Sequence, residues 1–139
     1  MAWLIDTCVL SEPTPKAPNP GVNTFIDHLD YGETYISVIS VAEIWKGINK
    51  LPSSRRRDAL EDWLKRKLLP SFTNPPLPID LEVAWKWGEL RAALDEQGNA
   101  MPAVDCILAA TALVHDLTLV TRNEVHFAHC RCRVFNPWR

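Results

Sequence analysis

The chain lacks a long apolar stretch, a strong net charge and a secretory leader pattern. No window approaches the roughly 18 consecutive apolar residues that read as a membrane helix. The first residues, MAWLIDT, carry no basic head before an apolar run. We therefore expect a soluble, cytoplasmic protein with no membrane partner. With 15 basic and 17 acidic side chains the net charge is -2, so any binding to nucleic acid has to be local.

Paired cysteine motifs are also missing. None of the four cysteines forms a C-x-x-C pair or a framework spacing: Cys8, Cys106, Cys130 and Cys132. This usage fits reduced thiols in a cytosolic protein. A zinc site is the alternative for one segment, where His126, His129, Cys130 and Cys132 fall within seven residues. Their compact spacing argues against zinc, because structural zinc sites usually take ligand pairs from two separated turns.

At 139 residues and 47% hydrophobic content, the chain has the size and core of one domain, spanning 1–139. Apolar or β-branched runs predict strands at 2–5, 34–38, 117–121 and 131–135. Helical spacing predicts helices at 23–29, from Ser40 onward, and at 54–69, 80–96 and 102–115. The proline-rich residues 11–21 predict a connection. Strands that alternate with helices predict an α/β fold, with a central parallel sheet flanked by helices on both faces.

Three carboxylates stand in apolar surroundings: Asp6 in AWLIDT, Glu43 in SVISVAEI and Asp105 in MPAVDCILAATAL. A fourth polar side chain, Asn123, follows in TLVTRN. An ionised carboxylate is costly beside apolar surface unless it is paired or bound to a cation. Oxygen ligands of this kind suit Mg²⁺ or Mn²⁺, which bind phosphate oxygens alongside a few carboxylates. The pattern therefore predicts phosphoryl transfer or phosphodiester hydrolysis.

The predicted topology brings these side chains toward one edge of the sheet. Ligands of open parallel sheets bind beyond the carboxyl ends of the strands, where Asp6 ends the first strand and Asn123 follows the third. Glu43 and Asp105 fall near the starts of helices, whose positive ends favour anions. Each also has a purely structural interpretation. Glu43 fits a capping box with Ser40, and Asp105 could simply complement the helix dipole.

Five segments in this order, LIDTCVLSE, ISVISVAEIWKGI, MPAVDCILAATAL, LTLVTRN and NPW, resemble the PIN-domain ribonucleases, specifically the VapC-like toxins of bacterial toxin–antitoxin modules. The resemblance covers essentially the whole chain. It implies a PIN-like fold, an endoribonuclease that depends on Mg²⁺ or Mn²⁺ and acts on tRNA or rRNA, a homodimer, and inhibition by a cognate VapB-like antitoxin. The family's metal ligands fall on Asp6, Glu43 and Asp105. Its fourth position, Asp or Asn among relatives, falls on Asn123.

The chain departs from the family pattern at two positions. Cys8 stands where Asn is expected after the Asp-Thr pair, and His126 stands where an acidic residue is expected before Phe. The neutral Asn123 leaves three carboxylates, which favours one tightly held metal over two. Next to it, Arg122 is our candidate for a phosphate contact with RNA. The basic clusters at 55–57 and 65–67 are interleaved with acidic residues, which favours a solvated helix face.

We thus predict a metal-dependent endoribonuclease with Asp6, Glu43, Asp105 and Asn123 as its catalytic residues. The alternative is a PIN-like module that has lost turnover and binds RNA or a protein partner, supported by Asn123 and Cys8. A phosphatase with a nucleophilic aspartate is disfavoured, because it requires a second aspartate where Cys8 stands.

Overall fold

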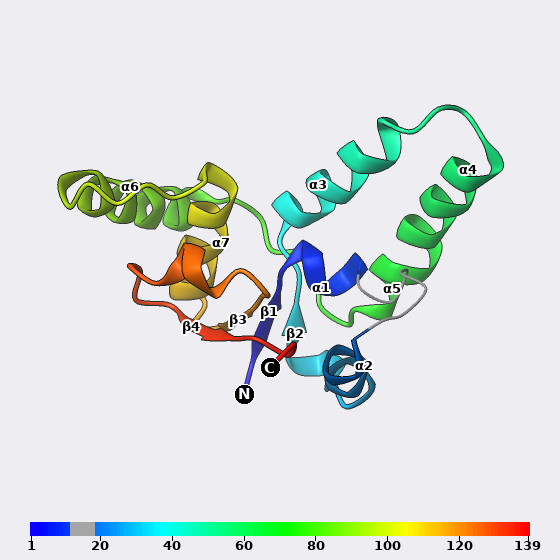
Figure 1. The fold of residues 1–139 in the computed structure, drawn as a ribbon, viewed down its shortest axis with the longest axis horizontal. Helices are drawn as coiled ribbons and strands as arrows, with labels where there is room; N and C mark the ends of the chain where they lie inside the picture. Colours follow the sequence, from blue (N-terminus) through cyan, green and yellow to red (C-terminus); the bar gives the residue numbers. More distant parts are fainter. Residues whose placement is uncertain (12–18) are drawn as a thin grey trace.

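Four short parallel strands form the centre of the computed structural model, which describes residues 1–11 and 19–139. They are β1 (Trp3–Ile5), β2 (Thr34–Tyr35), β3 (Thr118–Val120) and β4 (Arg133–Phe135), in the spatial order β2-β1-β3-β4 (Figure 1). Backbone pairing places Leu4 beside Leu119, and Leu119 beside Val134. Every pairing between these strands is parallel, which confirms the predicted α/β fold.

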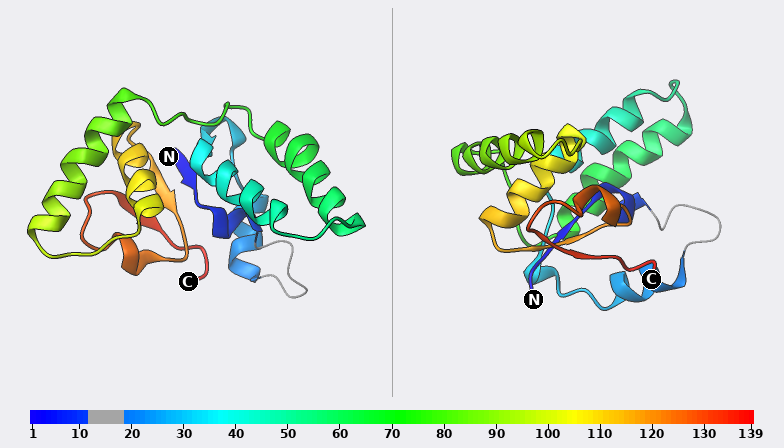
Figure 2. Two further views of the ribbon diagram at one scale, coloured as in Figure 1. Left: turned by 90° about the horizontal axis from the view of Figure 1, so that it is seen from above. Right: turned by 60° about the vertical axis from the view of Figure 1, so that its left-hand side comes forward.

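Helices connect the strands and cover the sheet. They are α1 (Thr7–Ser11), α2 (Pro20–Asp27), α3 (Val38–Asn49), α4 (Arg55–Asp62), α5 (Leu69–Ser71), α6 (Leu81–Glu96) and α7 (Ala103–Val114). Figure 2 shows α6 and α7 to one side of the strands and α1 to α4 to the other. Shorter helical segments are the 3-10 turns η1 (Tyr31–Glu33) and η3 (Glu124–Phe127) and the π-helix η2 (Trp63–Leu68).

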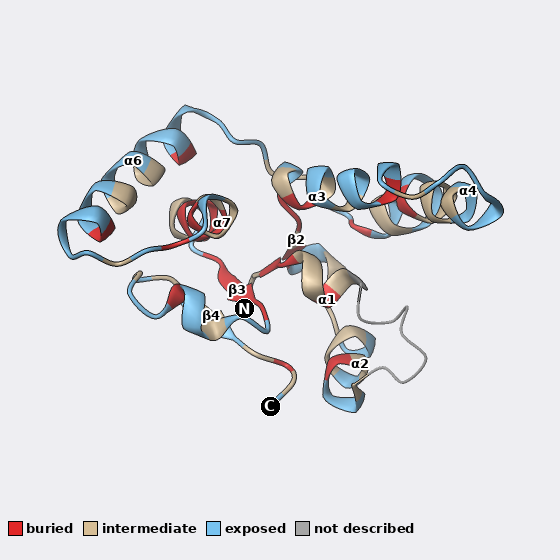
Figure 3. Cartoon of the chain, turned by 45° about the horizontal axis from the view of Figure 1, so that its top comes forward, coloured by how far each residue is buried: buried red, intermediate tan, exposed pale blue. Residues whose placement is uncertain are grey.

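The core divides into two clusters, one on each face of the sheet. Leu4 and Leu119 pack with Leu108 of α7 on one face. Ile5 and Val120, the next residues along their strands, pack with Val9 of α1 on the other. Neighbouring strand residues point to opposite faces, so apolar runs such as WLI and TLV cover both. Figure 3 shows the buried positions concentrated in the central strands and α7.

The start of α3 and both ends of α6 are set by local capping. The side chain of Asp80 accepts a hydrogen bond from the Val83 amide at 3.0 Å, and Gly98 adopts a positive φ of 71° just past the helix, both as predicted. The predicted start at Ser40 is wrong. Helix α3 begins at Val38, because Ser37 is the N-cap and accepts from the Ile39 amide at 3.1 Å.

Three other local predictions need correction. The connection predicted at 11–21 contains the start of α2, capped by Asn19, while residues 12–18 lie outside the described part. The helix predicted to end before Pro70 continues to Ser71. There the wider π turn shifts the bonding, with the Leu69 amide donating to the Leu64 carbonyl, and Pro70, which has no N–H, follows within the first turn of α5. Helix α1, directly after Asp6, was not predicted.

Within the described residues, no helix combines the length and apolarity needed to cross a bilayer.

Candidate metal and phosphate site

The site is built where β1 and β3 end side by side. Asp6 directly follows β1 and its amide donates to the Val120 carbonyl at 3.0 Å, which continues the parallel ladder by one residue. Thr121 directly follows β3, and its hydroxyl donates to Asp6 Oδ2 at 2.7 Å. Asp6 is 5% exposed and Thr121 is fully buried. A bond between residues 115 positions apart thus fixes the carboxylate at the end of the sheet.

The two residues that follow Asp6 in the chain also donate to its carboxylate. The Thr7 amide donates to Oδ1 at 2.7 Å, and the Cys8 thiol lies 3.8 Å from Oδ2 as a weak donor. Burial raises the pKa of Asp6, and the negative charge of Asp105 adds to this rise, while the bonds from Thr121 and Thr7 oppose it. The burial effect is the largest. Ionisation of Asp6 is therefore less favourable than that of an exposed aspartate, and a nearby positive charge would favour it.

Glu43 is connected to Asp6 by Thr7, which donates a hydrogen bond to each of the two carboxylates. On the exposed side of α3, its Oε1 accepts a hydrogen bond from the Thr7 hydroxyl at 3.0 Å. The capping box with Ser40 is absent, since the cap is Ser37 and Glu43 lies in the second turn of the helix. Ser40 is instead buried, and its hydroxyl has no hydrogen-bond partner in the structure described. Thr7 thus links α3 to the end of β1, with its amide on Asp6 and its hydroxyl on Glu43.

Asp105 lies in the first turn of α7, as predicted. Its Oδ2 is 2.7 Å from Nδ1 of His126 on η3. Asp105 is the more enclosed partner, with 15% of its side chain exposed against 46% for His126. One carboxylate oxygen of Asp105 is therefore held by the imidazole, while the charge of the group still acts on Asp6.

The two remaining predicted residues follow Thr121. The Asn123 amide donates to the Thr121 hydroxyl at 3.1 Å, and its exposed side chain makes no hydrogen bond within the described residues. Arg122 is exposed, and its guanidinium carbon stands 5.4 Å from the ring centre of Trp138. Both residues lie at the same strand end as Asp6.

The three carboxylates lie in the same region, but their side chains do not surround a common position for a metal ion. Among residues 1–11 and 19–139, no three Asp, Glu, His or Cys side chains gather as a formed metal cluster. Asp6 and Asp105 interact directly through their charges, and Glu43 joins them by way of Thr7. The donor chemistry nonetheless fits a hard cation. A carboxylate has about four lone-pair positions, and Asp6 uses three of them on Thr7, Thr121 and Cys8.

The zinc alternative finds no support at residues 126–132. His126 turns to Asp105, whereas Cys130 and Cys132 lie beside each other with their sulfurs 3.3 Å apart. Within the described residues, His126 and the two cysteines therefore lie at two separate places and do not surround one ion.

Thr7 and Thr121 were not predicted to be part of the site. Thr7 comes second after β1 and opens α1, and Thr121 directly follows β3; each donates its hydroxyl to an acidic side chain. A threonine within two residues of the end of an apolar run, in LIDT and in LVT, was the available signal.

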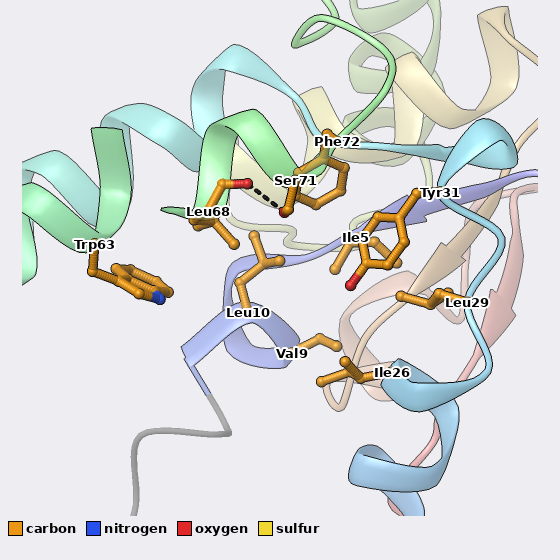
Figure 4. Close-up of a pocket in the computed structure, with 10 residues that line it drawn as sticks. All are labelled: Ile5, Val9, Leu10, Ile26, Leu29, Tyr31, Trp63, Leu68, Ser71 and Phe72. Carbon is orange, nitrogen blue, oxygen red and sulfur yellow. Dashed lines mark hydrogen bonds between the residues drawn. The ribbon is translucent and has the colours of Figure 1, made fainter. Parts of the chain in front are cut away.

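An apolar cavity of about 230 Å³ lies behind the site, on the face of the sheet that carries α1 (Figure 4). Its described lining is mainly aliphatic and aromatic, including Val9, Leu10 and Phe72, and the polar side chains within that lining are those of Tyr31, Trp63 and Ser71. Since none of the described lining residues is charged, this part of the cavity does not suit a metal ion or a phosphate.

Comparison with known proteins gives a consistent result. A family model described as PIN domain matches residues 3–131. The chain is 36% identical over 135 residues to Toxin FitB of Neisseria gonorrhoeae, covering 97% of each chain. It is 30% identical over 135 residues to the VapC ribonuclease Y4jK of Sinorhizobium fredii, covering 97% of this chain and 96% of that one. The crystal structure of FitAcB from Neisseria gonorrhoeae superposes with a TM-score of 0.93 at 36% identity and covers 99% of each chain.

Proposed function

The chain belongs to the PIN-domain family, and we propose that it is the endoribonuclease toxin of a VapBC-type toxin–antitoxin module, cleaving RNA phosphodiester bonds with Mg²⁺ or Mn²⁺. One observation carries the proposal most directly. The buried carboxylate of Asp6 is fixed at a strand end beside a second carboxylate, Asp105, with no basic side chain hydrogen-bonded to it in the described structure. Such a pair is stabilised by a divalent cation. The relatives named as a toxin and as a ribonuclease support the same activity.

The ligands we assign are Asp6, Glu43 and Asp105. Asp6 has an acceptor position to spare, Asp105 has the oxygen that His126 does not hold, and Glu43 has the oxygen that Thr7 does not hold. When bound, the ion polarises the scissile phosphate and lowers the pKa of an attacking water. Three carboxylates and a neutral Asn123 favour one metal position.

The other residues of the site position these groups. Thr121 and Thr7 fix both oxygens of Asp6, so that the carboxylate is oriented before any ligand arrives. His126 orients Asp105 in the same way. Exposed beside them, Arg122 is suited to contact an RNA phosphate, and Asn123 to hold a water or a phosphate oxygen.

The proposed toxin–antitoxin function implies three kinds of partner. We assign an RNA substrate, tRNA or rRNA, a cognate VapB-like antitoxin, and a homodimer that forms a larger hetero-oligomer with the antitoxin. Residues 1–139 act as a single PIN domain in this proposal, and the site of action is the cytoplasm, where these RNAs are.

The test uses protein freed of antitoxin and a pool of tRNA and ribosomal RNA. Cleavage should require Mg²⁺ or Mn²⁺, stop with EDTA and recover with excess metal. Asp6→Asn, purified in parallel, should be silent, which excludes a contaminating nuclease. Asp27→Asn is the matched control, since it removes one exposed carboxylate far along α2 and should leave cleavage unchanged.

Calcium sharpens the comparison. Ca²⁺ occupies oxygen sites with looser geometry, so it should permit RNA binding with little cleavage. RNA binding without cleavage under every metal would reject the enzyme and favour the binding-module alternative. A cleaving Asp6→Asn protein would reject the assigned metal site while leaving the fold family untouched.

A further inference from the structure

Two thiols lie side by side on the segment between η3 and β4. Cys130 and Cys132 flank Arg131, and their sulfur atoms are 3.3 Å apart. Both side chains are partly exposed, so small molecules in solution can reach them. A disulfide bond is about 2 Å long, so the two sulfurs need to approach by little more than 1 Å to form one.

The fold positions this pair. The Cys130 thiol donates to the carbonyl of Phe127 at 3.1 Å, and Phe127 is buried in the core at 2% exposure. Cys132 directly precedes β4, whose pairing with β3 fixes the chain on that side. Both cysteines also pack against the cluster that contains Leu119. The sulfurs are therefore held together by elements on either side of Arg131.

The two thiols are electrostatically unequal. The hydrogen bond between the two sulfurs, in which either atom could be the donor, lowers the pKa of Cys130 to about 7, while burial opposes this effect. The pKa of Cys132 is raised by the same partner. A thiolate is the attacking species in exchange reactions, and a thiol whose pKa is near the ambient pH attacks best. By contrast, burial raises the pKa of Cys8 and of Cys106.

We propose that Cys130 and Cys132 form a reversible intramolecular disulfide by exchange with a small disulfide of the glutathione class. The Cys130 thiolate attacks one sulfur of the small disulfide, which releases one small thiolate and leaves a mixed disulfide on Cys130. The Cys132 thiol then loses its proton and attacks the Cys130 sulfur, which releases the second small thiolate. In total, two protein thiols and one small disulfide become one protein disulfide and two small thiols.

The exchange changes the segment next to the proposed nuclease site. It removes the S–H that Cys130 donates to Phe127 and closes a ring in the segment between β4 and η3, the turn that carries His126. A shared metal ion is a weaker use of the pair, because the described residues supply no third ligand nearby. The exchange requires neither RNA nor metal and stands independently of the ribonuclease proposal.

The experiment equilibrates the protein, with EDTA present, against stepped ratios of oxidised to reduced glutathione. Acid quenching, alkylation and peptide mass spectrometry then count each thiol. Cys130 and Cys132 should become unreactive together, joined in one peptide, while Cys8 and Cys106 remain alkylated. Cys132→Ser should accumulate one glutathione on Cys130, and Cys130→Ser should take up glutathione severalfold more slowly.

Protein unfolded in urea provides the test that depends on the fold. The native protein should close the disulfide at a lower fraction of oxidised glutathione than the unfolded chain, because the fold supplies the 3.3 Å approach. Equal ratios would overturn the proposal. So would a wild-type protein that stops at the mixed disulfide, keeps both thiols free, or joins two chains on a non-reducing gel.

Discussion

Replacing Asp6 by Asn is expected to stabilise the folded protein at neutral pH, although it removes the central carboxylate of the proposed site. The reason is the environment of Asp6, where burial and the charge of Asp105 raise its pKa. Each unit by which a carboxyl pKa is raised costs the ionised folded state about 1.4 kcal/mol. Asparagine has nearly the same shape and carries no charge, so the substitution removes the free-energy cost of ionising a buried carboxyl group.

The substitution also has a cost. Asn keeps an acceptor for the Thr121 hydroxyl, but its amide NH₂ then faces the Thr7 amide, which loses its acceptor. The loss of one such hydrogen bond costs about 1 kcal/mol. We expect relief of the buried charge to outweigh this loss, so Asp6→Asn should melt at a higher temperature than the wild-type protein at neutral pH.

The sign of the pH dependence follows from the raised pKa. The folded state binds the Asp6 proton more tightly than the unfolded state, so wild-type stability is lost as pH rises from the ordinary value near 3.8 through the higher folded value. The advantage of Asp6→Asn should therefore be full at pH 7.5 and shrink toward pH 4. Thermal melts in EDTA measure it, with Asp27→Asn as the exposed control. An Asn variant that is less stable at every pH, or whose advantage does not vary with pH, would refute the reasoning.

Substitutions at three further positions probe the rest of the site. Thr121→Val removes the hydroxyl that reaches Asp6 and should lower the unfolding free energy by about 1–3 kcal/mol in urea titrations, whereas Thr121→Ser should lose less; equal losses would mean that the hydroxyl contributes nothing. Asn123→Asp should tighten Mn²⁺ binding roughly tenfold in calorimetric titrations, and unchanged affinity would place Asn123 outside the ligand set. His126→Ala should weaken Mn²⁺ binding roughly tenfold by releasing Asp105, and an unaltered isotherm would show that His126 does not orient the ligand.

The sheet and its two covered faces were predictable because the signals are local and strong. Short apolar runs and capped helices specify the α/β order, and Asp80 and Gly98 bound α6 as the sequence indicates. The start of α3 was not predictable in this way. Ser37 and Ser40 are equally good caps in isolation, and both are fully buried. Ser37 becomes the cap because its backbone is extended and forms a parallel bridge to Leu77, so the helix can begin only after it.

The same limit applies to α1 and to the site. The β-branched residues that open α1 favour a strand locally, and the helix forms because Val9 is buried in the core and its amide bonds to the Asp6 carbonyl. Asp6, Glu43 and Asp105 were identifiable because charge beside apolar sequence is unusual. Thr121 was not, because threonine is an ordinary strand residue and its bond to Asp6 spans 115 positions.

Because of the strand order, the proposed site can form only after most of the chain has been synthesised. In the chain β1 precedes both of its neighbours in the sheet, β2 and β3, and the β3 residues are 118–120. At about 5–20 residues per second, a ribosome needs several seconds or more after making Asp6 to make Thr121. Until then Asp6 has no partner at the strand end, and Asp105 is itself nearly as late. A nascent chain that stops before Thr121 therefore carries acidic residues without the arrangement that we propose cleaves RNA, so an incomplete translation product should have no nuclease activity.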